Sequence, residues 1–176
     1  RARETDALLT PAEETNFRSV AGVLLWLTLH TRPDLASALS LSQDSNKRVI
    51  NLVNVEKALA YARKTSLQTI MIRKIDMSDA CIIAYGDSSW ANAAEFKSQA
   101  GLVIGLAEKG ALMADGGTWS LLAWRSYRIK RVCRSTLAAE TSACDVALDL
   151  AEYIRKIMVE MLNVNCRATD RRPEKY

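Results

Sequence analysis

The chain has 176 residues, of which 49% are hydrophobic and three are proline, so its composition is that of a folded globular protein, not a disordered or fibrous one. At a net charge of +4, this length suffices for one good core or two small ones. Four cysteines without C-x-x-C spacing and one histidine argue against zinc, and the densest apolar run, residues 20–29, is too short to cross a membrane. We expect an intracellular protein with reduced thiols and no membrane partner.

Three helices are predicted in the first third of the chain. Residues 10–13 (TPAE) form a helix start, with a capping hydroxyl, proline at the first helical position and glutamate three residues after the cap. This helix should run to about Leu29. A second is expected over 34–42 and a third over 55–64, capped by Asn54. Together they predict a helical unit without a catalytic cluster.

The pattern then changes to one typical of strands. Apolar, isoleucine-rich or glycine-punctuated segments predict four strands at 68–75, 81–85, 99–106 and 118–125. A long helix is predicted over 131–161, where apolar residues recur at three- and four-residue spacing. Strands followed by a helix predict an α+β fold, in which the long helix packs on the sheet.

Two carboxylates are candidates for a metal site. Glu140 lies on the inward side of the long helix, which Ser135 or Thr136 can cap, and a buried carboxylate requires a cation. Asp87 follows the strand 81–85, where it is either an ordinary turn residue or a ligand. If a strand end and a helix start converge, the two carboxylates offer hard oxygen ligands suited to Mg²⁺ or Mn²⁺.

A basic segment separates the last strand from the long helix. Taken alone, it is either a solvated face or a contact for a polyanion, and its position just before Glu140 favours the polyanion. Trp90, after Asp87, is expected to be a core aromatic more than a substrate-facing one. The five cations of the basic segment are Arg125, Arg128, Lys130, Arg131 and Arg134.

Four blocks, in order, resemble the reverse transcriptase–ribonuclease H portion of copia-type retrotransposon Pol polyproteins. Residues 17–27 (FRSVAGVLLWL) with 31–35 (TRPDL) are similar to "YRSLVGSLLYL…TRPDI". Residues 85–92 (YGDSSWAN) resemble "YSDADWAG", and 97–101 (KSQAG) parallel "RSTSG". Residues 124–141 (WRSYRIKRVCRSTLAAET) are similar to "WSSKKQPTVALSSTEAEY", with equal spacing from the tryptophan to the second glutamate.

The resemblance implies a helical connection segment of reverse transcriptase at 1–66 and a ribonuclease H-like domain, with a mixed sheet and a long packed helix, at 67–176. Asp87 and Glu140 take the places of the family's first metal-binding aspartate and helix glutamate. The implied activity is metal-dependent hydrolysis of RNA in RNA–DNA hybrids, in a cytoplasmic particle or the nucleus, within the rest of the Pol polyprotein.

The family's later acids have no counterpart here. Asp145 and Asp149 share the helix of Glu140, and Asp170 lacks a preceding apolar strand. We therefore expect a C-terminally truncated fragment with little or no nuclease activity. The alternatives are a non-catalytic nucleic-acid-binding or scaffold domain decayed from a retroelement, and a protein-interaction module built on the helical unit through Leu25 and Trp26.

Overall fold

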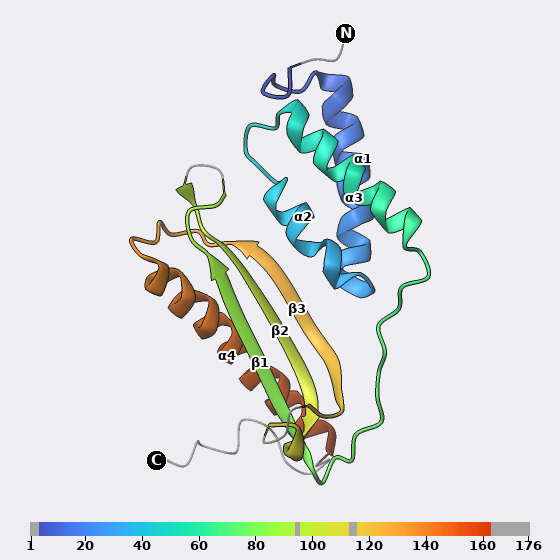
Figure 1. Ribbon diagram of the computed structural model, residues 1–176, viewed down its shortest axis with the longest axis vertical. Helices are drawn as coiled ribbons and strands as arrows, with labels where there is room; N and C mark the ends of the chain where they lie inside the picture. The colour runs from blue at the N-terminus through green and yellow to red at the C-terminus, as the bar shows by residue number, and fades with distance from the viewer. Residues whose placement is uncertain (1–3, 94–95, 113–115, 163–176) are drawn as a thin grey trace.

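The computed structural model describes residues 4–93, 96–112 and 116–162, and it confirms the α+β fold class (Figure 1). A helical unit comes first, made of α1 (Pro11–His30), the 3₁₀ turn η1 (Pro33–Leu35), α2 (Ala36–Leu41) and α3 (Val49–Lys64). A sheet and one long helix follow: β1 (Ala80–Ser89), β2 (Gln99–Glu108), the 3₁₀ turn η3 (Lys109–Leu112), β3 (Trp119–Arg128) and α4 (Thr136–Leu162). Our expectation for Asp170 lies outside the described residues.

The start of α1 was predicted correctly because its signal is local. The Glu13 backbone N–H donates to the Thr10 hydroxyl, and the Thr10 backbone N–H donates in return to the Glu13 carboxylate at 2.7 Å. This reciprocal pair satisfies two of the N–H groups that a helix start leaves without partners. The helix then buries Phe17 and Leu24 against α2 and α3.

The predicted start of the third helix is wrong by six residues. α3 begins at Val49, and Asn54 lies exposed inside the helix instead of capping it. The capping amide belongs to Asn51, whose side-chain oxygen accepts from the Arg48 backbone N–H at 2.8 Å. Val49 and Ile50 have weak helix propensity, but burial of the first turn against the helical core overrides it.

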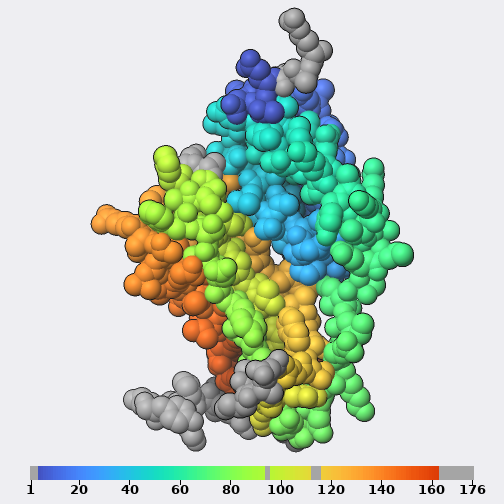
Figure 2. Space-filling model, in the orientation of Figure 1, coloured from blue at the N-terminus to red at the C-terminus, as the bar shows by residue number. Residues whose placement is uncertain are grey.

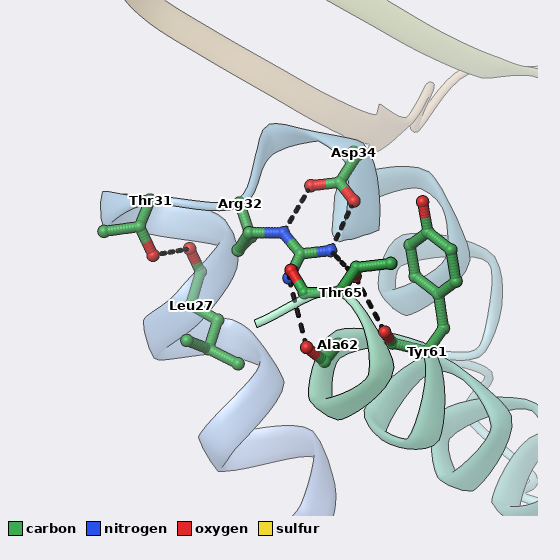
Figure 3. A network of polar contacts seen from close by, with 7 residues as sticks. All are labelled: Leu27, Thr31, Arg32, Asp34, Tyr61, Ala62 and Thr65. Atoms are coloured by element: carbon green, nitrogen blue, oxygen red, sulfur yellow. Dashed lines mark hydrogen bonds and ion pairs between the residues drawn. The ribbon is translucent and has the colours of Figure 1, made fainter. Parts of the chain in front are cut away.

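A buried arginine joins the ends of α1 and α3 (Figure 3). The Arg32 guanidinium donates to both carboxylate oxygens of Asp34, at 2.9 and 2.7 Å, although the residue is only 5% exposed. It also donates to the backbone carbonyls of Ala62 and Thr65, in the last turn and at the cap of α3. One side chain therefore satisfies carbonyls that the helix end leaves without intrahelical partners.

The sheet has the strand order β1-β2-β3, and both strand pairs in the described part of the chain are antiparallel. The predicted strands at 81–85, 99–106 and 118–125 are confirmed, although each is longer at one or both ends than we expected. The prediction of a mixed sheet differs from this result, because no parallel pair occurs among the described strands. Asp87 pairs with Gly101, which in turn pairs with Ser126.

The long helix α4 covers one face of the sheet, along β1 and β2. Its buried alanines Ala143 and Ala147 pack on β2, Ala143 beside Ala100 and Ala147 beside Leu102. Because Ala100 and Leu102 pair with successively earlier residues of β1, α4 runs antiparallel to β1. The helical unit has a separate core, so the described residues form two cores, while the domain boundary at residue 66 stays a prediction.

The predicted strand at 68–75 is wrong, because no strand forms there. The segment descends beside β3, and the Ser120 hydroxyl meets it by accepting from the Arg73 N–H and donating to the Arg73 carbonyl. A hollow of about 600 Å³ separates residues 69–71 from the start of β3 (Figure 2). The sequence favours a strand, but at this separation no neighbouring backbone can pair with it.

The helical unit and the sheet meet along β3. The indole N–H of Trp124 donates to the backbone carbonyl of Thr28 in α1. Arg128 forms an ion pair of 2.6 Å with Asp44, in which both side chains are about four-fifths buried. These contacts come from the sheet face opposite to α4 and place η1 and α2 above it.

Candidate functional site

The end of β1 and the start of α4 lie in direct backbone contact. Along β1, Ile82 and Ala84 pack toward α4, and Gly86 continues this alternation. A Cβ atom added to Gly86 would lie only 2.8 Å from the carbonyl oxygen of Ala143. The thiol of Cys144 also lies 3.9 Å from the Gly86 carbonyl oxygen. Asp87 is therefore next to this contact in the strand, and Glu140 is one turn before it in the helix.

Asp87 is on the other face of the strand. Since successive side chains of a strand alternate, the packing of Gly86 on α4 turns Asp87 toward the helical unit. There Asp87 is exposed and lines a hollow of about 390 Å³. The sheet side of this hollow includes Tyr85, Gly101 and Trp124, and its other side is formed by η1 and α2. Its carboxylate accepts the backbone N–H of Ser88 at 2.8 Å, which is a local contact.

Glu140 is half-buried in the second turn of α4. The helix start is fixed by Ser135, whose hydroxyl accepts the Ala138 N–H at 3.2 Å, so one of the two predicted caps is confirmed. Ala139 and Ala143, on either side of Glu140, are fully buried, which places the carboxylate at the border of the packed face.

The predicted convergence of Asp87 and Glu140 is achieved by the backbone alone. The two residues lie at the same end of the sheet, but Asp87 points from the face away from α4. Among the described residues, no group of three or more histidine, cysteine or acidic side chains could hold a metal ion. Asp87 thus lies on the face of β1 away from the helix that carries Glu140, and the metal site stays a prediction.

The five predicted cations do not form one cluster but lie in three different environments. Arg128 is occupied by Asp44 on the face toward the helical unit. The Arg125 guanidinium stacks over the Tyr127 ring at 4.8 Å on the face toward α4, where burial raises the pKa of the Tyr127 phenol. The remaining three are exposed in the connection between β3 and α4, and we call them the basic connection: Lys130, Arg131 and Arg134.

Trp90 joins the basic connection to the end of β1. Its indole N–H donates to the backbone carbonyl of Cys133 at 2.9 Å, and the residue is 49% exposed. The expectation of a core aromatic is therefore wrong, since about half of the residue's surface is exposed. An exposed aromatic beside three cations is a combination that stacks bases and contacts phosphates in proteins that bind nucleic acids.

Sequence reasoning missed the partner of Arg128. Asp44 lies 84 residues earlier, in the connection after α2, and no local pattern links the two residues. The placement of Asp87 had a signal that could have been used, because Ile82, Ala84 and Gly86 form an alternating small or apolar row that marks the packed face.

No protein-family model matches the chain, and no solved structure gives a significant match. The resemblance to copia-type polyproteins therefore depends on the four sequence blocks. Among the described residues, no helix combines the length and the apolar character needed to cross a bilayer.

Proposed function

We propose that the chain is a portion of a copia-type retrotransposon Pol polyprotein whose sheet and long helix form a ribonuclease H-like domain. The observation that carries this proposal is the backbone contact of Gly86 with Ala143. This contact brings Asp87 and Glu140, the two residues that match the family's acidic positions, to the same end of the sheet. The basic connection leads into the start of α4 at the same end of the sheet.

In this chain the proposed role is to bind an RNA–DNA hybrid. The basic connection places Lys130, Arg131 and Arg134 on the surface, where each can neutralise a phosphate, and Trp90 lies beside them. Arg128 is assigned no phosphate contact, because its charge is already met by Asp44. Hydrolysis, with Mg²⁺ or Mn²⁺, is proposed only for the intact parent protein.

The test is the salt dependence of binding to a labelled RNA–DNA hybrid, followed by fluorescence anisotropy. Replacing the three cations of the basic connection by alanine should weaken binding and lower the slope of log K against log salt by up to about 0.9 for each phosphate that is no longer neutralised. The matched control replaces three exposed cations of α3, Lys57, Arg63 and Lys64, and should leave the slope unchanged. Equally weakened binding in both triple variants would contradict the proposal.

A non-catalytic nucleic-acid-binding or scaffold domain is the second candidate, and the orientation of Asp87 away from α4 favours it. The two candidates differ in their response to Mg²⁺. If hybrid binding strengthens with Mg²⁺ and this strengthening disappears in Asp87→Asn and in Glu140→Gln, the nuclease ancestry is supported. Binding that ignores Mg²⁺ and both substitutions supports the non-catalytic domain.

A further inference from the structure

The outer face of α1 is apolar although it faces solvent. No charged residue occurs between Arg18 and Arg32, a span of more than three helical turns. Trp26 is 60% exposed and Leu29 is 63% exposed, while the opposite side of the helix is already buried in the helical core. A helix that is apolar on all sides is normally covered on all sides, so this face indicates a missing partner.

Gly22 lies in the middle of this face, and no contact within the described chain requires a glycine there. Glycine inside a helix is less favourable than alanine, yet a Cβ atom added here would meet nothing within 4 Å. No other element of the described chain comes close enough to need the missing side chain. The missing side chain leaves open space on the surface beside Ser19 and one turn before Trp26, and we call this space the notch.

The large side chain next to the notch is held in place before any partner arrives. The Trp26 ring stacks on His30, with ring centroids 4.9 Å apart. The His30 ring nitrogen Nδ1 also lies 2.8 Å from the Trp26 backbone carbonyl oxygen. An ordered aromatic loses little conformational entropy on burial, which is characteristic of an anchor residue at an interface.

We propose that this face binds a second copy of the chain, with the two α1 helices antiparallel about a two-fold axis level with Leu24. Trp26 lies two residues after that level and Gly22 two before it, so each Trp26 enters the notch of the other helix. Leu29 and Ser19, five residues after and before, are matched in the same way. A two-fold interface needs a self-complementary surface, and this face carries both knob and notch.

Charge favours the same arrangement. The paired face contains no ionised side chain that would be desolvated or repelled by its copy, and Arg18 at its edge is engaged by Glu14 at 2.7 Å. This interface shares no residue with the carboxylates or with the basic connection, so it is independent of the proposed nucleic-acid binding.

Sedimentation equilibrium of the full 176-residue chain tests the proposal. We expect a concentration-dependent monomer–dimer equilibrium, with a Kd raised roughly tenfold or more by Trp26→Glu. Gly22→Leu fills the notch without a clash inside the monomer, and should also break the dimer while leaving the circular dichroism spectrum and the melting temperature of the monomer intact or improved. The matched control is Leu67→Glu, at an apolar residue that is 93% exposed outside α1, and it should leave the Kd unchanged.

Three results would overturn the proposal. A chain that remains monomeric at several hundred micromolar, on the order of the weakest specific associations, has no partner in its own copy. A dimer that survives both Gly22→Leu and Trp26→Glu uses another surface. A dimer weakened equally by Leu67→Glu reflects general hydrophobic association.

Discussion

The backbone of Gly86 in β1 packs against the carbonyl group of Ala143 in α4 with no side chain between them. This close approach determines how deeply the long helix sits on the sheet, and it decides which face of β1 carries Asp87.

Gly86→Ala should destabilise the protein by about 1–3 kcal/mol, because the added methyl group would meet backbone atoms that cannot rotate away. The measurement is urea unfolding followed by circular dichroism. Gly101→Ala is the matched control in the neighbouring strand, where a Cβ has open space, and it should be neutral or slightly stabilising. Equal destabilisation at both glycines would mean that flexibility, not contact with α4, is what glycine provides.

Arg32→Ala should cost about 2–4 kcal/mol in the free energy of unfolding, because it leaves Asp34 and the carbonyls of Ala62 and Thr65 without their donor. Arg32→Lys should recover only part of this stability, since an ammonium group cannot form the two parallel hydrogen bonds to Asp34. Chemical denaturation of both variants is the measurement. Arg18→Ala removes an exposed pair with Glu14 and should change stability by less than about 0.5 kcal/mol.

The ion pair between Arg32 and Asp34 predicts that stability depends on pH. Hydrogen bonds from Arg32 hold the pKa of the Asp34 carboxyl below its usual value. The unfolded chain therefore binds the proton more readily, so this contribution to stability is present above about pH 4 and is lost as the pH falls through the lower, folded pKa. Denaturation between pH 7 and pH 2 should show that the stability difference between wild type and Asp34→Asn shrinks with acid. A difference that is constant over this range would contradict the assignment.

Gly22→Ala should stabilise the monomer by up to about 1 kcal/mol, because alanine is the better helix former and the added methyl group points into open space. Thermal unfolding at a concentration well below the dimer Kd is the measurement. A lower melting temperature would show that Gly22 is needed inside the monomer, and it would remove the main reason for assigning the notch to a partner.

What could be predicted from the sequence depended on how local each signal is. The start of α1 at Thr10 and the strands around β1, β2 and β3 follow from caps and from short-range patterns. The segment 68–75 has the composition of a strand, but pairing needs a neighbour at the right distance, and Ser120 meets this segment only through a side chain. The start of α3 was missed because the burial of Asn51 and Leu52, not the helix propensity of the residues, keeps its first turn helical.

The candidate site divides in the same way. The sequence predicted Asp87 just after a strand and Glu140 near a helix start. The structure places Asp87 inside β1, two residues before its end, and Glu140 in the second turn of α4. The face on which Asp87 lies depends on long-range packing, namely on α4 resting against Gly86. The neutralisation of Arg128 by Asp44 depends on how the helical unit docks, which no window of sequence contains.

The presence of two cores has a consequence for heat denaturation. The helical core around Phe17 and Leu24 shares no member with the clusters between α4 and the sheet, and the two are joined by a few polar bridges such as Arg128 with Asp44. Each part can unfold without exposing the apolar core of the other, so calorimetry should resolve two endotherms, with a van 't Hoff enthalpy smaller than the calorimetric one. Asp44→Asn, by loosening the bridge, should move those endotherms further apart.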